Sequence, residues 1–280
     1  YSPKEMINPR STLTNSTLIL KSSEHYFFEL GHYTEKLKSW INKEGTLTPE
    51  VKKFLDHWFA EGLQNWDISR DGPYFGFKIP GEDDKYFYVW LDAPIGYAAF
   101  SDKAAKEKGQ KFEDYWHDSN TEITHFIGKD IVYFHTLFWP AMLMGANYTL
   151  PKRVVVHGML KVNGEKMSKS RGTFINADTF AKHLKPESLR YYLACKLSSK
   201  IEDIDLNFED FTGRVNADLV NKIINLISRT VPMLHKYNHG QANLIDFENS
   251  EFRNLFNQIQ DLSKNIKLDY EACETHKIGR

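Results

Sequence analysis

The feature that most limits the fold of this chain is a strand, helix, strand pattern between residues 123 and 157. Residues 123–127 form a short apolar run that stops at Gly128, and residues 153–157 form a second, β-branched run. The segment between them, from about Asp130 to Gly145, has the length of a crossover helix. Two strands joined in this way lie parallel in a buried sheet, so the pattern predicts an α/β fold.

Two short motifs follow these predicted strands directly. Gly128-Lys129-Asp130 comes after the first strand, and His157-Gly158 closes the second. Open sheets of this kind bind ligands at the carboxyl ends of their strands, so we expect both motifs at a ligand-binding edge. A small residue followed by a carboxylate at such an end can hold the ribose diol of a nucleotide, which makes Gly128 and Asp130 candidates.

The segments on either side of this unit differ in character. Residues 1–89 are aromatic-rich, with strands predicted at 17–21, 24–30, 74–79 and 86–91. Helical spacing there connects Leu37, Trp40 and Ile41 and, after a start near Pro49, Val51, Leu55, Trp58 and Phe59. After about residue 176 the chain turns helical, with a helix at 186–197 and amphipathic stripes at 219–231 and 252–266. These stripes predict the start of a helical bundle.

Composition excludes several classes of protein. The net charge of the 280 residues is -1, so any contact with nucleic acid must come from local patches. Cys195 and Cys273 are isolated, which predicts neither a disulfide framework nor a zinc site and favours a reducing, cytoplasmic compartment. No apolar run reaches the length of a membrane span, and no signal-peptide pattern follows Tyr1. We expect the chain to be a piece of a longer protein.

A basic loop is the strongest candidate for chemistry. Lys166-Met167-Ser168-Lys169-Ser170 lies between Gly164 and Gly172, and Arg171 adds a third cation within six residues. Lysine acts as a flexible point charge on phosphate oxygens, and glycine lets the backbone approach a ligand. We call these five residues the lysine loop. As a composition alone, such a run is more often a solvated surface than a polyphosphate site.

Four further candidates each have a plainer alternative. Ile131, His135 and Trp139 share one face of the predicted crossover helix, as core residues also would. Trp90, Pro94 and Tyr97 surround a turn that could wall an apolar slot for a thioether, or form an ordinary corner.

Arg70 could clamp a carboxylate, although an ion pair with Asp67 or Asp71 is the commoner arrangement. Asn225 and Arg229, four apart on a predicted helix, could read a base edge and a phosphate of RNA, or could simply be solvated.

Taken together and in this order, the motifs resemble the bacterial-type methionyl-tRNA synthetases, a family of class I aminoacyl-tRNA synthetases. The lysine loop matches the second signature of that class, and the resemblance covers most of residues 1–235. It implies the second half of a Rossmann-type nucleotide-binding domain with a connective insertion, followed by the start of an all-α helical bundle. The implied boundaries are 1–85 for the insertion, 86–175 for the catalytic half, 176–212 for a linking stem and 213–280 for a partial anticodon-binding domain.

The resemblance also implies roles. Methionine would be bound by Arg70, Trp90, Pro94, Tyr97, Ile131, His135 and Trp139. ATP would be bound by Gly128, Asp130, His157, Lys166, Met167, Ser168 and Lys169, of which Asp130, Lys166, Ser168 and Lys169 would act in catalysis. Asn225 and Arg229 would recognise the anticodon of tRNA. The implied cofactors are ATP with Mg²⁺, and a structural zinc in the longer protein whose ligands lie outside this chain.

One departure from the family matters. The His-Ile-Gly-His-type first signature of the class does not occur in these residues. We therefore expect this piece alone to be unable to aminoacylate tRNA. Two other interpretations remain open: a non-catalytic RNA-binding module derived from a synthetase, and a sister synthetase for leucine, isoleucine or valine.

The lysine loop generates a prediction for the full-length protein. Lys169→Ala should lower the rate of adenylate formation far more than the affinity for methionine, because a loop cation acts mainly on the transition state. Initial rates of ATP–pyrophosphate exchange and the apparent KM for methionine measure the two effects. An unchanged turnover with a raised requirement for methionine would contradict the prediction.

Overall fold

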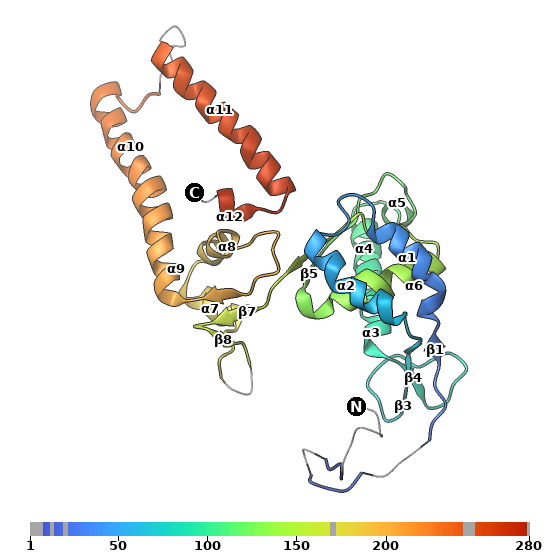
Figure 1. Ribbon diagram of the computed structural model, residues 1–280. Coiled ribbons are helices and arrows are strands. Elements are labelled where there is room, and N and C mark those ends of the chain that lie inside the picture. The colour runs from blue at the N-terminus through green and yellow to red at the C-terminus, as the bar shows by residue number, and fades with distance from the viewer. Residues whose placement is uncertain (1–7, 12–13, 19–21, 169–171, 243–249, 279–280) are drawn as a thin grey trace. The chain divides into compact units, whose positions relative to one another are not determined.

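The computed structural model of the chain describes residues 8–11, 14–18, 22–168, 172–242 and 250–278 (Figure 1). The chain divides into two compact units. Unit 1 comprises Tyr1–Glu35 and Gly62–Asp118, and unit 2 comprises Lys36–Glu61 and Ser119–Arg280. The fold is mixed α/β with a helical C-terminal part, as the sequence predicts.

Unit 1 contains two short antiparallel strand pairs and a group of helices. Strand β1 (Phe27–Phe28) pairs with β2 (Trp66–Asp67), and β3 (Ser69–Asp71) pairs with β4 (Lys85–Phe87). The helices are the 3-10 helix η2 (Leu30–Tyr33), α3 (Val89–Asp92), α4 (Ile95–Glu107) and α5 (Glu113–Trp116). Pro94 separates α3 from α4.

Several strand predictions in this unit are wrong. Residues 74–79 form no strand, and Phe75 and Phe77 are 104% and 70% exposed. The aromatic residues alternate along the segment, but neither of these two side chains is buried. A single β-bridge, from Lys78 to Tyr86, joins the segment to β4. The run predicted at 86–91 is a strand only as far as Phe87 and then becomes α3, because a short apolar run fits either element.

The strand predicted at 24–30 shrinks to β1. Of the strand predicted at 17–21, Thr17 makes one bridge to Arg10, and residues 19–21 lie outside the described residues.

The predicted strand, helix, strand pattern is confirmed in unit 2. Strand β5 (Thr124–Gly128) lies parallel to β6 (Arg153–His157). The crossover contains the 3-10 turn η3 (Lys129–Ile131), the π-helical turn η4 (Phe134–Phe138) and α6 (Trp139–Gly145). Pro140, the second residue of α6, has no amide N–H to donate, and the wider π turn immediately precedes the helix.

A hydrophobic core surrounds this pair of strands. Two further helices, α1 (Thr34–Ile41) and α2 (Pro49–Glu61), contribute Leu37, Trp40 and Leu55, as their spacing predicts. The indole N–H of Trp40 donates to the carbonyl of Pro151 at 2.8 Å, just before β6. The alternation of β5 buries His125 and Ile127 and leaves Phe126 65% exposed.

A second layer follows β6. The strands β7 (Leu160–Val162), β8 (Glu165–Lys166) and β9 (Ile204–Leu206) form a sheet in the order β8-β7-β9. Helices α7 (Ala177–His183), α8 (Pro186–Ala194) and α9 (Phe208–Arg214) accompany it. Their shared core consists of Phe180, Tyr192, Leu206 and Phe211.

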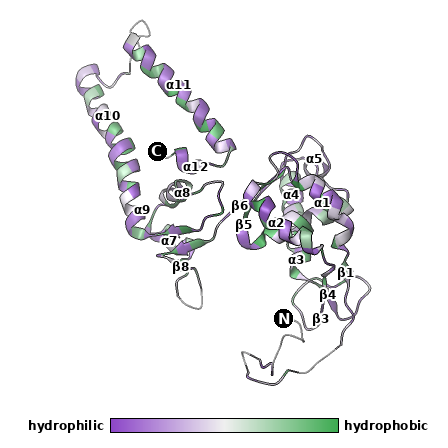
Figure 2. Ribbon diagram, viewed as in Figure 1, coloured by the Kyte–Doolittle hydropathy of each residue, from purple (hydrophilic) through white to green (hydrophobic). Residues whose placement is uncertain are grey.

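The C-terminal part is helical. It contains the π-helical segment η5 (Val215–Ile224), α10 (Asn225–Asn238), α11 (Ser250–Glu271) and α12 (Thr275–Ile278). Figure 2 shows hydrophobic and hydrophilic bands alternating along α10 and α11. The predicted apolar stripes are largely exposed: Ile227 is 53% exposed and Leu262 is 58% exposed. In the part of the chain that the structure describes, we find no helix both long enough and apolar enough for a bilayer.

The core of unit 2 generates a test of the fold. Leu137→Ala removes a side chain that is 0% exposed, and it should lower the free energy of unfolding by about 2–5 kcal/mol through lost burial and a residual cavity. Leu226→Ala, at a site 68% exposed, is the matched control and should change it by no more than about 0.5 kcal/mol. Urea unfolding followed by circular dichroism measures both, and equal losses would contradict the assigned core.

Candidate functional site

The carboxyl ends of β5 and β6 meet in register. Gly128 is the direct partner of His157 in the parallel ladder. A Cβ at Gly128 would lie 2.7 Å from Oδ1 of Asp130, so the glycine leaves room for this exposed carboxylate to fold back on the strand end. His157 Nδ1 donates to the carbonyl of Gly158 at 2.9 Å, which leaves Nε2 as an acceptor. The predicted placement of both motifs at one edge is therefore confirmed.

The crossover helix brings its three predicted residues onto one face. Ile131 is half-buried, and its carbonyl accepts a hydrogen bond from His135 Nδ1 at 3.1 Å. His135 and Trp139 are buried, with 2% and 3% of their surfaces exposed. Burial lowers the pKa of His135 from its usual value, which favours the neutral imidazole.

His125 belongs to the same cluster but was missed from the sequence. The indole N–H of Trp139 donates to His125 Nε2 at 3.3 Å, and the ring centroids of His125 and His135 lie 5.7 Å apart. Burial first, and the nearby His135 second, lower the pKa of His125 to about 4. The two-residue period of β5 places His125 beside Ile127 on the buried face, and that signal could have identified it.

Four of the predicted methionine residues belong to unit 1. The Arg70 guanidinium pairs with Asp67 at 3.1 Å and stacks over the ring of Tyr88 at 3.9 Å. This is the plainer arrangement that the sequence favours for Arg70. Trp90 is half-buried in α3 and Pro94 is buried between two helices. Tyr97 in α4 is 40% exposed, and burial raises its pKa.

The structure describes the first three residues of the lysine loop. Lys166 is exposed at the end of β8, and Met167 and Ser168 are half-buried, whereas Lys169, Ser170 and Arg171 lie outside the described residues. Thr173 closes the loop: its hydroxyl accepts from the Ser168 amide at 3.0 Å and donates to the Lys166 carbonyl at 3.0 Å. The amide of Thr173 also donates to the Ser168 carbonyl at 3.2 Å.

A tight hairpin presents this loop. Strands β7 and β8 are joined by Asn163 and Gly164, whose positive φ angles of 48° and 81° suit a two-residue type I′ turn. The turn places Lys161 directly opposite Lys166. Lys161 pairs with Asp203 at 3.0 Å, whereas Lys166 is exposed on the neighbouring strand. The Asn-Gly pair is a strong hairpin signal that the sequence interpretation did not use.

The two residues predicted to contact the anticodon lie on α10. Asn225 is half-buried at the first position of the helix, and Arg229 is exposed one turn later. Their four-residue separation places them on one helical face. Their role stays a prediction.

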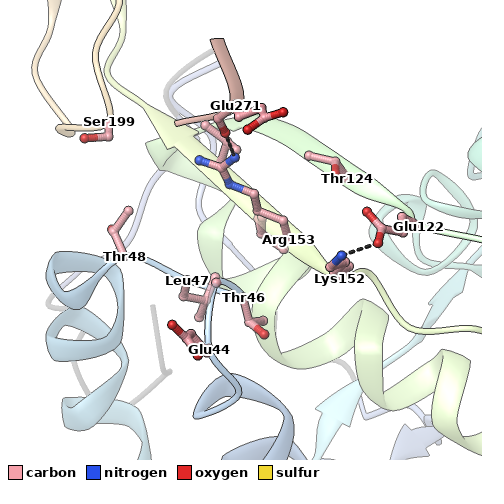
Figure 3. Close-up of a pocket in the computed structure, with 13 residues that line it drawn as sticks. Glu44, Thr46, Leu47, Thr48, Glu122, Thr124, Lys152, Arg153, Ser199 and Glu271 are labelled. Atoms are coloured by element: carbon pink, nitrogen blue, oxygen red, sulfur yellow. Dashed lines mark hydrogen bonds and ion pairs between the residues drawn. The ribbon is translucent and has the colours of Figure 1, made fainter. Parts of the chain in front are cut away.

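A separate cavity of about 540 Å³ opens at the other end of β5 and β6 (Figure 3). Lys152 pairs with Glu122 there, and the Arg153 guanidinium donates to the last carbonyl of α11, at Glu271. The predicted site residues lie elsewhere. Among the described side chains, no group of three or more His, Cys, Asp or Glu could hold a metal ion. The expected Mg²⁺ and zinc stay predictions.

Known proteins are similar to this chain in sequence and fold. Residues 1–231 match the family described as tRNA synthetases class I (M). The structure of Mycobacterium tuberculosis methionyl-tRNA synthetase in complex with methionyl-adenylate is similar, with 27% identity and a TM-score of 0.82. This similarity covers 100% of the present chain and 55% of that chain.

Two further structures of the enzyme from that organism also match. One, bound by methionyl-adenylate, has 29% identity and a TM-score of 0.80 over 99% of this chain and 54% of its own. The other, an apo form, has 25% identity and a TM-score of 0.76 over 96% and 52%. The chain thus spans little more than half the length of these solved structures.

The buried histidine cluster predicts a dependence of stability on pH. As pH falls below 6.5, the ordinary pKa, the unfolded chain protonates His125 before the folded chain does, so stability is complete above 6.5 and is lost toward pH 4. His125→Asn keeps an acceptor for Trp139 but cannot titrate. It should lose about 2–3 kcal/mol less stability than the wild type between pH 7 and 4.5.

Urea unfolding at the two pH values measures this difference. His57→Asn is the control, because the side chain of His57 is 68% exposed, and it should lose as much stability as the wild type. Equal losses in His125→Asn and the wild type would show that His125 is not a buried neutral imidazole.

Proposed function

The chain belongs to the class I tRNA synthetase (M) family, and on that premise we propose that the protein containing it is a methionine–tRNA ligase. The observation that carries the proposal is the in-register pair of strand ends at Gly128 and His157. They occur in a chain that is similar along its whole length to a structure holding methionyl-adenylate. The strand ends would hold the adenosine, and the lysine loop would reach the phosphates.

The reaction has two steps. In the first, a carboxylate oxygen of methionine attacks the α-phosphorus of ATP, and the bond to the bridging oxygen of the β-phosphate breaks to release pyrophosphate. In the second, a ribose hydroxyl of the terminal adenosine of tRNA attacks the carbonyl carbon of methionyl-adenylate, and AMP leaves. The net result is an ester between methionine and tRNA.

Positioning and electrostatics account for the proposed roles at the ATP end. Beside Gly128, the Asp130 carboxylate would accept hydrogen bonds from the ribose hydroxyls. His157 would face the adenosine. Lys166 is exposed at the end of β8, where its ammonium group could bind a phosphate oxygen. Together with Lys169 it would stabilise the charge that develops on pyrophosphate, and Met167 and Ser168 would shape the loop.

The resemblance assigns methionine contacts to residues of each unit. Ile131, His135 and Trp139 in unit 2 offer apolar surface and a neutral imidazole, which suits an uncharged thioether. In unit 1, Trp90, Pro94 and Tyr97 would contact the methionine side chain, and Arg70 would fix the amino acid near its carboxylate. Arg70 would have to exchange or share its pairing with Asp67 to do so.

The remaining roles extend beyond one active site. Asn225 and Arg229 would contact the anticodon of tRNA, and Mg²⁺ would accompany ATP as part of the substrate. A structural zinc would be ligated outside this chain. Both cysteines are free thiols, and a cytoplasmic location stays a prediction.

Amino-acid-dependent ATP–pyrophosphate exchange by the full-length protein tests the proposal. Exchange should depend on methionine and should be weaker with leucine, isoleucine or valine. Because one methylene is worth only about 1–3 kcal/mol, discrimination on the order of tenfold or more is expected. Stronger exchange with one of the other three would identify a sister synthetase. Binding of tRNA without any exchange would identify a non-catalytic module.

A further inference from the structure

One carboxylate joins the strand end to the hairpin that carries the lysine loop. Asp203, the residue before β9, accepts hydrogen bonds from three donors. Its Oδ1 lies 2.6 Å from Lys129 Nζ and 2.9 Å from the backbone N of Met159. Its Oδ2 lies 3.0 Å from Lys161 Nζ. All three segments belong to unit 2.

The three donors have distinct places in the candidate site. Lys129 is the middle residue of the Gly128-Lys129-Asp130 motif at the end of β5. Met159 immediately precedes β7, and Lys161 lies within β7 directly opposite Lys166. Asp203 therefore connects the strand end proposed to bind the ribose with the base of the hairpin that presents the lysine loop. It also pairs with Lys161, the lysine opposite Lys166 in the hairpin.

The backbone beside Asp203 packs closely against the segment that precedes β7. A Cβ at Gly158 would lie 2.1 Å from the carbonyl oxygen of Glu202 and 2.6 Å from the amide N of Asp203. Only glycine leaves room for the two segments to touch. The amide of Ile204 donates to the carbonyl of Met159 at 2.9 Å, immediately before β9 and β7 pair in parallel.

A second carboxylate two residues later holds the other end of the hairpin. Asp205 Oδ1 accepts from the amide of Gly164 at 2.8 Å, at the turn between β7 and β8. Asp203 and Asp205 therefore fasten the hairpin at its base and at its tip. Of the two, only Asp203 also contacts the strand end, through Lys129.

An ordinary surface ion pair is the alternative. The Asp203 side chain is 24% exposed, and exposed pairs contribute little to stability. The hydrogen bonds from Lys129, Met159 and Lys161 hold the pKa of Asp203 well below its usual range, so the carboxylate is charged at neutral pH. Asp203 accepts hydrogen bonds from three donors, which come from the strand end and from the hairpin. An isolated surface ion pair has only one donor and joins no two parts of a site.

We propose that Asp203 is a positioning residue that holds the hairpin of the lysine loop at a fixed place against the Gly128-Lys129-Asp130 strand end. This inference rests on the proposed function, because the two sides would contact different parts of one ATP molecule. Displacement of catalytic groups by about 1 Å can reduce a rate by as much as a hundredfold. A carboxylate that fixes the separation would therefore act on turnover without touching the substrate.

Asp203→Asn in the full-length protein tests the proposal. ATP–pyrophosphate exchange is measured per active site, with sites counted from the burst of adenylate, and methionine binding is measured by equilibrium dialysis. The kcat should fall at least about tenfold while the methionine Kd changes less than about twofold, because only the alignment of the phosphates is lost.

Asp218→Asn is the matched control. Asp218 also pairs with a lysine, Lys222 at 2.8 Å, and with a hydroxyl, that of Tyr191 at 3.1 Å, but it lies in η5 away from the hairpin. Its kcat per active site should stay within about twofold of the wild type. Asp203→Glu should recover part of the lost kcat because it restores the charge.

Lys129→Met and the double variant separate positioning from general damage. If Asp203 acts through Lys129, Lys129→Met should lower kcat by itself, and Lys129→Met/Asp203→Asn should lose less than the product of the two single losses. If Asp203→Asn does not fold, the kcat of Lys129→Met serves as the test instead.

A kcat per active site within about twofold of the wild type in Asp203→Asn would overturn the proposal. So would a rise in the methionine Kd that parallels the loss of kcat, because that pattern means general disruption. If the wild type itself shows no methionine-dependent exchange, the proposed function fails, and this inference fails with it.

Discussion

The parallel pairing of β5 with β6 is the constraint on which the rest of the site depends. Parallel strands must be joined by a crossover, and here the crossover carries Ile131, His135 and Trp139. Parallel pairing also brings both carboxyl ends to one edge, which sets Gly128 beside His157. One register thus determines where a nucleotide could bind and which helix stands beside it. The buried His125 connects the strand to the crossover helix, since it lies on β5 and accepts a hydrogen bond from the indole N–H of Trp139.

The lysine loop depends on a second set of contacts. The Asn163–Gly164 turn, the hydroxyl of Thr173 and the carboxylate of Asp203 determine where the hairpin and the first residues of the lysine loop lie. These contacts use polar groups on short elements rather than a large core. Polar contacts of this kind orient the hairpin but contribute little to the free energy of folding. That combination suits a loop that binds a highly charged ligand.

Local patterns were enough to predict the parallel unit, the strand-end motifs and the helices α1, α2, α8, α10 and α11. They failed at residues 74–79 and 86–91, where short apolar runs fit a strand, a bend or a helix equally well. They did not identify His125, although the two-residue period of β5 places it on the buried face. They could not identify Asp203, because its role depends on Lys129, 74 residues away, and such a contact leaves no periodicity in the sequence.

The position of a bound ligand tests the central claim most directly. An experimental structure of the full-length protein with a non-hydrolysable analogue of methionyl-adenylate would show which groups contact the nucleotide. We expect the ribose hydroxyls within hydrogen-bonding distance of Asp130, the adenosine beside His157, and the methionine side chain in contact with His135 and Trp139. A nucleotide bound away from the carboxyl ends of β5 and β6 would contradict it.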